Sequence, residues 1–123
     1  EYTPDLLVAD LSFISLEKVL PALLGCAAPR FDMLALVKPQ FEVGRERIGK
    51  GGVVRDRATR VDAIAGAAQA ARDAGFAVLG ACSSGLPGPA GNREAFLWLA
   101  ETGRDGAADD LHALAETVET GED

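Results

Sequence analysis

Three charged residues border the short apolar runs of this 123-residue chain. Asp10 directly follows the apolar run 6–9, Lys38 directly follows the run 33–37, and Glu94 directly precedes a further run. Short apolar runs that end at a charge are typical of strands buried in a parallel sheet. An amine beside carboxylates can accept a proton as a general base or stabilise a developing anion. These three residues are therefore the candidates for acid–base chemistry.

The alternation of apolar runs and amphipathic segments predicts an α/β fold with a mostly parallel sheet. Ser15 is a candidate N-cap for the first helix, and Pro21 should kink that helix or mark its true start. Asp56 is a candidate N-cap for an alanine-rich second helix that Gly75 ends. The expected elements are strands at 6–9, 33–37, 76–82 and 95–100 and helices at 16–24 and 57–74.

The last two predicted strands are joined by about 12 residues without a helical pattern, which favours an antiparallel return. Ligands of open α/β sheets bind at the carboxyl edge of the parallel strands. An antiparallel final strand would start at that edge, so Glu94 would join Asp10 and Lys38 there. Taken singly, Asp10 could be a loop acid, Lys38 could extend into solvent and Glu94 could be a solvated strand end. Their shared edge favours a functional site.

The net charge of −7 is unevenly distributed along the chain. Residues 101–123 contain eight acids and one base, so residues 1–100 are neutral overall. Segment 38–60 contains seven bases and three acids, which indicates a surface that faces an anion. The acidic tail has apolar residues at helical spacing, so we expect it to form an amphipathic helix.

Four motifs resemble the TlyA family, the FtsJ-like ribosomal RNA 2′-O-methyltransferases that are often labelled haemolysin A. The resemblance covers about residues 5–100, and the acidic tail 101–123 lies outside it. The motifs are D-L-S-F-I-S-L at 10–16, V-K-P-Q-F-E-V-G at 37–44, G-K-G-G-V-V-R-D at 49–56 and G-P-A-G-N-R-E at 88–94.

The resemblance implies that residues 1–100 are the C-terminal half of a Rossmann-type, S-adenosylmethionine-dependent methyltransferase domain. Asp10, Lys38 and Glu94 would be three members of the family's Lys-Asp-Lys-Glu tetrad. Asp10 and Phe13 would contact the cofactor, and no metal would be needed. The first lysine, the Gly-rich cofactor loop and an S4-like RNA-binding domain would lie upstream, so we expect the isolated chain to be inactive.

The basic segment contains the phosphate-loop pattern G-x-x-x-x-G-K at 44–50. Position 51 is Gly, which lacks the hydroxyl that binds magnesium, so nucleotide hydrolysis is disfavoured. We expect instead a basic loop that contacts the phosphates of ribosomal RNA, with a plain surface loop as the alternative. The expected phosphate contacts are Arg45, Arg47, Lys50 and Arg55.

The remaining reactive or aromatic residues receive simpler interpretations. Phe13 and Phe41 follow Asp10 and Lys38 by three residues each and could stack on a base, whereas Trp98, in an apolar run, is expected in the core. Cys26 and Cys82 fit no metal or disulfide pattern, so we expect small core residues in a reducing cytoplasm. His112 is expected on the surface of the tail helix.

Two further expectations follow from this placement. Within the family's sheet, strand 6–9 would lack one neighbour, so the isolated chain should self-associate through that edge and bind S-adenosylmethionine weakly or not at all.

A non-catalytic RNA-binding or membrane-active haemolysin-like module is the alternative function. Against a membrane-active module stand the lack of an apolar run of about 20 residues and of a basic amphipathic helix.

Overall fold

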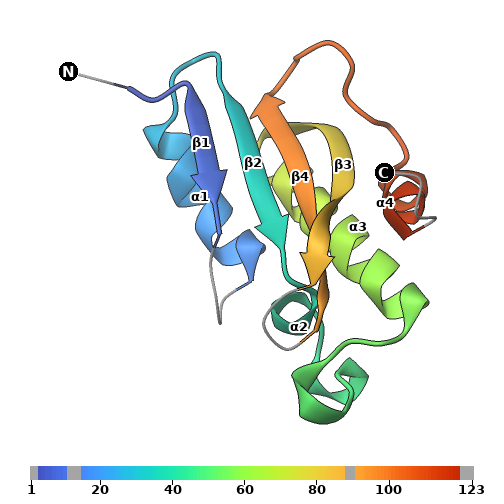
Figure 1. The fold of residues 1–123 in the computed structure, drawn as a ribbon. Helices are drawn as coiled ribbons and strands as arrows, with labels where there is room; N and C mark the ends of the chain where they lie inside the picture. The colour runs from blue at the N-terminus through green and yellow to red at the C-terminus, as the bar shows by residue number, and fades with distance from the viewer. Residues whose placement is uncertain (1–2, 11–14, 88–90, 120–123) are drawn as a thin grey trace.

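The computed structural model describes residues 3–10, 15–87 and 91–119, which form one sheet with helices packed on it (Figure 1). Two short 3-10 turns, η1 (Arg45–Arg47) and η2 (Lys50–Gly52), lie in the basic segment. The other elements are β1 (Leu6–Ala9), α1 (Leu16–Cys26), β2 (Asp32–Val37), α2 (Pro39–Glu42), α3 (Arg57–Asp73), β3 (Phe76–Pro87), β4 (Arg93–Glu101) and α4 (Leu111–Glu119).

The sheet has the strand order β1-β2-β4-β3. Strands β1 and β2 are parallel, whereas β4 lies between β2 and β3 and is antiparallel to both. The predicted α/β class, with a mostly parallel sheet and an antiparallel final strand, is therefore confirmed. The start of β4 consequently lies at the carboxyl edge of the other three strands, where the turns η1 and η2 also lie (Figure 1).

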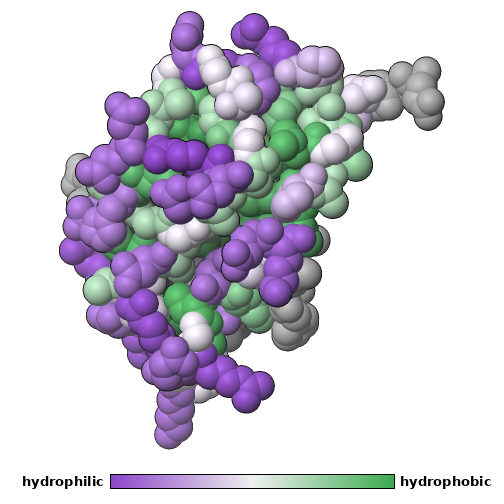
Figure 2. All heavy atoms as spheres, turned by 180° about the vertical axis from the view of Figure 1, so that it is seen from behind, coloured by the Kyte–Doolittle hydropathy of each residue, from purple (hydrophilic) through white to green (hydrophobic). Residues whose placement is uncertain are grey.

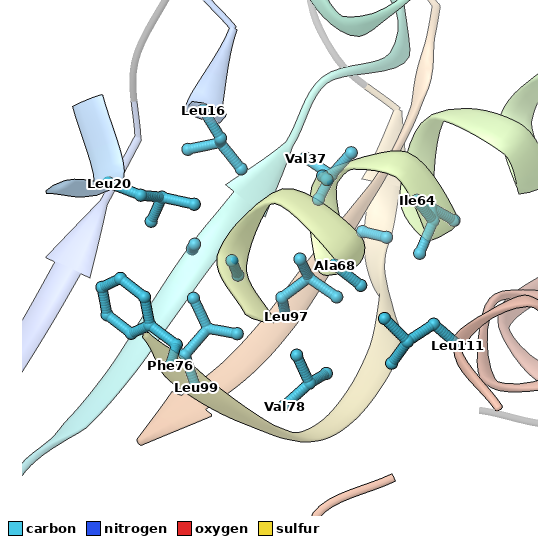
Figure 3. Packing of buried hydrophobic residues seen from close by; sticks show 14 of the residues in the cluster. Leu16, Leu20, Val37, Ile64, Ala68, Phe76, Val78, Leu97, Leu99 and Leu111 are labelled. Carbon is cyan, nitrogen blue, oxygen red and sulfur yellow. The ribbon is translucent and has the colours of Figure 1, made fainter. Parts of the chain in front are cut away.

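Helices α1 and α3 cover one face of the sheet and form the main core with it (Figure 3). Val37 of β2 and Leu97 of β4 are fully buried beneath Ile64 and Ala68 of α3. The side of α3 that faces the sheet is largely alanine, and these short side chains let the helix lie close to the strands. Pro21 lies inside α1 without ending it. Because Pro21 and Glu17 are both exposed, water can replace the missing helical hydrogen bond.

The acidic tail forms the expected helix, α4, which packs against α3 and β3. Leu111, Ala115 and Val118 are buried in that contact. The guanidinium of Arg60 on α3 lies 2.7 Å from the carboxylate of Glu119 in a largely buried ion pair. Seen from behind, the molecule presents hydrophilic side chains with hydrophobic patches between them (Figure 2).

The opposite face of the sheet is apolar, and none of the described helices covers it. Trp98 is 45% exposed there, and its indole nitrogen donates to Asp32 Oδ1 at 2.9 Å. The prediction that Trp98 is a core residue is wrong, because Trp98 alternates with the buried Leu97 and Leu99 and so faces the open side. Cys82 is opposite Phe96 on this same face.

The prediction that both cysteines are core residues is also wrong. Cys82 lies on the open face of the sheet, and Cys26 is the last residue of α1. Both thiols are exposed. His112 is exposed on α4, as expected, with its Nδ1 atom 3.6 Å from Glu116. Among the helices of the described residues, none is both long and apolar enough to cross a membrane.

A charged cluster joins β2 to β4 at the edge away from Lys38. Arg104 Nε lies 2.6 Å from Glu101 Oε2, its Nη1 lies 3.1 Å from Asp32 Oδ1, and its Nη2 donates to the carbonyl of Phe31 at 2.8 Å. The hydrogen bond from Arg104, together with one from the backbone of Phe31, lowers the pKa of Glu101 from 4.5 to about 2. The guanidinium therefore fixes the register of β2 and β4 at this end.

Replacing Glu101 by Gln should lower stability at neutral pH, and the difference from the unaltered chain should shrink on acidification. Because the folded-state pKa is lowered, the stabilisation by ionised Glu101 is complete above 4.5 and is lost as pH falls through about 2. Urea unfolding midpoints measured across this range test the prediction. Asp105→Asn, at an exposed neighbouring acid, is the control. A difference between Glu101→Gln and the unaltered chain that stays constant with pH would contradict the account.

Candidate functional site

Lys38 and Asp10 form an ion pair at the carboxyl edge of the sheet. Lys38 Nζ lies 2.6 Å from Asp10 Oδ1, and the two side chains are 13% and 61% exposed. Each residue directly follows its strand, and β1 and β2 are paired in parallel, so the two chain ends run side by side. Pro39 begins α2 and keeps Lys38 in an extended conformation. The structure thus brings together two of the residues that the sequence singled out.

Glu94 lies next to this pair because of the antiparallel pairing of β2 with β4. Val37 is paired with Ala95, so Lys38 and Glu94 are the next residues of that register. Glu94 is only 8% exposed, and its Oε2 atom has no hydrogen-bond partner among the described residues. A buried acceptor without a donor is costly, so a ligand that donates a hydrogen bond to this oxygen would be stabilised by it.

Glu42 connects the segment after Lys38 to the segment after Asp10, a role that sequence reasoning missed. Its carboxylate accepts hydrogen bonds from Ser15 Oγ at 2.7 Å and from the backbone nitrogen of Leu16 at 2.9 Å. Ser15 is itself the N-cap of α1, as predicted, and accepts from the backbone nitrogen of Glu17. Glu42 therefore completes the cap of α1 and ties α2 to it. Its partners are 26 and 27 residues away, so no local pattern indicates the contact.

The turns of the basic segment lie beside the site, and the cations of this segment differ in their exposure and in their ion pairs. Arg45, Lys50 and Arg55 are exposed. Arg47 is bound to α3, because its Nη2 atom lies 2.9 Å from Asp62 Oδ2 and 3.0 Å from Thr59 Oγ1. The phosphate-loop pattern at 44–50 leads into a second 3-10 turn, and α3 begins only after a further extended stretch.

The aromatic candidates for base stacking fall on different parts of the chain. Phe41 lies in α2, is half-buried and is three residues beyond Lys38. Phe13 belongs to segment 11–14, which lies outside the described residues. The predicted contact of Phe13 with a cofactor therefore stays a prediction.

A family model described as FtsJ-like methyltransferase matches residues 1–101. The chain is 55% identical over 95 residues to the 16S/23S rRNA (cytidine-2′-O)-methyltransferase TlyA of Mycobacterium tuberculosis, covering 77% of this chain and 35% of that protein. It is 41% identical over 96 residues to Bacillus subtilis YqxC, described as a candidate rRNA methyltransferase, covering 78% of this chain and 34% of that protein.

A solved structure shows the same fold. A Lactococcus lactis protein described as a candidate hemolysin superposes with a TM-score of 0.84 at 33% identity, covering 95% of this chain and 57% of that chain. The chain spans about a third of the length of the curated relatives named above.

Replacing Glu42 by Gln should change the pH dependence of stability in a defined direction. Burial raises the pKa of Glu42 above 4.5, against the lowering effect of the hydrogen bonds from Leu16 and Ser15. The contribution of Glu42 to stability is therefore fully present below 4.5 and falls as pH rises through the folded-state pKa. Chemical unfolding should show that the advantage of the unaltered chain over Glu42→Gln is larger at about pH 4 than at about pH 7.

Glu46→Gln is the matched control, because Glu46 is an exposed acid of η1, whereas the nearby charge of Glu17 contributes to the raised pKa of Glu42. An advantage over Glu42→Gln that grows as pH rises would contradict the account, since it would mean that the two hydrogen bonds outweigh burial.

Proposed function

This chain belongs to the FtsJ-like methyltransferase family, and we propose that it carries the proton-handling part of a site that methylates ribose 2′-hydroxyls of ribosomal RNA. The observation that carries the proposal is the Lys38–Asp10 ion pair beside the buried carboxylate of Glu94. The name of the Mycobacterium tuberculosis relative supports the ribosomal RNA substrate. Such a substrate favours a cytoplasmic location.

Lys38 and Glu94 supply what a ribose hydroxyl needs as it becomes a nucleophile. The hydroxyl loses its proton as its oxygen attacks the methyl group, so negative charge develops on that oxygen. The amine of Lys38 can accept the proton when neutral. When charged, as its 2.6 Å contact with Asp10 favours, it stabilises the oxyanion, and the proton would pass to the carboxylate of Glu94. The partnerless Oε2 atom of Glu94 can accept a hydrogen bond from the ribose hydroxyl.

Asp10 fits a role beside the cofactor. When bound, S-adenosylmethionine supplies an electrophilic methyl group on a cationic sulfur. The carboxylate of Asp10 remains 61% exposed although it is paired with Lys38, so one side of it is open to a cationic ligand. We propose that Asp10 and Phe13 hold part of the cofactor. The remaining contacts would come from a longer polypeptide, so we propose that the isolated chain is inactive.

We propose that the exposed cations of the basic segment bind the phosphates of ribosomal RNA. Arg45, Lys50 and Arg55 are exposed, and the segment with η1 and η2 to which they belong lies at the same edge of the sheet as the ion pair (Figure 1). Arg47 would contribute less, because Asp62 already neutralises much of its charge. Phosphate contacts fix the position of an RNA without reading its sequence, so this surface would hold the RNA while the ribose enters the site.

We also propose that the isolated chain self-associates through β1. This strand is at the edge of the sheet, and its Leu6 and Val8 side chains are 62% and 67% exposed. The adjacent open face adds Leu34 and Trp98, so an apolar surface adjoins a row of unpaired backbone groups. Edges of this kind pair with other strands unless charge or proline blocks them.

Lys38→Ala in the full-length protein should reduce methyl transfer to ribosomal RNA by roughly 10²-fold or more, the usual effect of losing a group that transfers a proton or stabilises an oxyanion. Circular dichroism and the melting temperature should show an intact fold. Lys18→Ala, at an exposed lysine of α1, is the control and should leave the rate unchanged. Normal turnover by Lys38→Ala would show that Lys38 is not catalytic.

The 123-residue chain on its own should elute as a dimer or larger species in size-exclusion chromatography with light scattering. Val8→Lys should shift it toward monomer, because a charge at the edge opposes strand pairing. Ala113→Lys, at an exposed position of α4, is the control. Calorimetry should detect weak or no binding of S-adenosylmethionine. A monodisperse monomer that binds the cofactor with micromolar affinity would overturn both the self-association and the missing-contact proposals.

A further inference from the structure

Asn92 joins two distant segments of the chain through both atoms of its side-chain amide. It is 1% exposed and lies two residues before Glu94. Its Oδ1 atom accepts a hydrogen bond from the backbone nitrogen of Val54 at 2.8 Å, and its Nδ2 atom donates to the carbonyl of Gly52 at 2.9 Å. Asparagine can do both because its amide carries a donor and an acceptor side by side.

In the segment that Asn92 binds, residues 49–54, the other backbone hydrogen bonds mainly join members of the segment to one another. The backbone nitrogen of Gly49 donates to the carbonyl of Val53 at 2.7 Å, and that of Gly52 donates to the carbonyl of Gly49 at 3.1 Å. Gly51 and Gly52 adopt left-handed conformations, with φ of 76° and 77°, which let this turn close tightly. Its attachment to the sheet therefore depends on Asn92 and on the buried side chain of Val54.

The cations that could bind RNA flank this attachment. Lys50 lies two residues before Gly52, Arg55 directly follows Val54, and both are exposed. At its other end, the segment is tied to α3 by the contacts of Arg47 with Asp62 and Thr59. The carbonyl of Arg55 also accepts a hydrogen bond from Arg60 Nη1 of α3 at 2.8 Å. The Asn92 amide thus ties the turn that carries Lys50 to the strand of Glu94, and it shares the placement of Arg55 with Arg60.

We infer that Asn92 is a positioning residue for RNA binding. It keeps the phosphate-binding cations Lys50 and Arg55 at a fixed place relative to the strand that carries Glu94. The inference rests on the proposed function, because it assumes that these cations contact RNA. Loss of these hydrogen bonds loosens the turn from the strand, so the phosphates and the reacting ribose are held together less firmly.

The test measures RNA affinity as a function of salt for Asn92→Ala and Asn92→Asp in the full-length protein. Each phosphate contact to single-stranded or duplex nucleic acid contributes about 0.7 to 0.9 to the slope of log affinity against log salt. With a ribosomal RNA fragment as probe, both variants should lower this slope by about 1 to 2 and raise the KM for RNA roughly tenfold. The KM for S-adenosylmethionine should stay unchanged.

Two further variants separate the possible failures. Leu111→Ala removes a buried side chain of α4, so it should lower the melting temperature without altering the salt slope. The double variant Lys50→Ala, Arg55→Ala should lower the slope, and an unchanged slope there would refute the proposed RNA surface itself. If that double variant lowers the slope but the Asn92 variants only melt earlier, the positioning role of Asn92 is refuted.

If neither Asn92 variant folds, hydrogen exchange on the unaltered protein tests the positioning role of Asn92. The backbone amide of Val54 should exchange slowly, because Asn92 accepts its hydrogen. Addition of the RNA fragment should increase the protection of residues 44–52. Rapid exchange at Val54, or no change on RNA addition, would overturn the inference.

Discussion

The antiparallel pairing of β4 with β2 is the constraint on which the site depends. Val37 is paired with Ala95, so the same register places the backbones of Lys38 and Glu94 next to each other. A parallel β4 would start at the opposite edge of the sheet and would leave Glu94 far from Lys38. Parallel pairing of β1 with β2 adds Asp10 to the same edge. Backbone hydrogen bonds between strands thus set the positions of all three charged side chains.

Polar side chains, more than apolar ones, hold the segments at this edge together. Glu42 ties α2 to the start of α1, and Asn92 ties the turn at Gly52 to the start of β4. Buried polar contacts are directional, so they fix one arrangement where few apolar residues are present. Glu94 Oε2 and Gln40 Oε1 are exceptions, because these buried oxygens have no donor among the described residues. Each unsatisfied acceptor costs stability, and the one on Glu94 belongs to a residue of the proposed site.

Much of the fold follows from local patterns. Ser15 caps α1 and Gly75 ends the second predicted helix with a left-handed φ of 104°, because capping and glycine conformation depend on neighbouring residues. The edge location of Asp10, Lys38 and Glu94 also follows from where the apolar runs end. The proposed chemical roles of these residues rest on the family resemblance and on their geometry, and they stay predictions.

Other features depend on contacts that no local pattern records. Trp98 and Cys82 face the open side of the sheet, and an apolar run does not reveal which of its two faces is covered. Glu42 and Asn92 bond to partners 26 to 40 residues away, so their roles become visible only in the folded chain. The ion pair of Arg47 with Asp62 likewise distinguishes Arg47 from Arg45, Lys50 and Arg55.

The central claim is that the Lys38, Asp10 and Glu94 side chains serve methyl transfer to a ribose oxygen. Nucleoside analysis by mass spectrometry tests it most directly, after incubation of the full-length protein with S-adenosylmethionine and ribosomal subunits. The account predicts a new 2′-O-methylated nucleoside, with the added mass on the ribose. A methyl group found only on a base, or no methylation of ribosomal RNA, would contradict it.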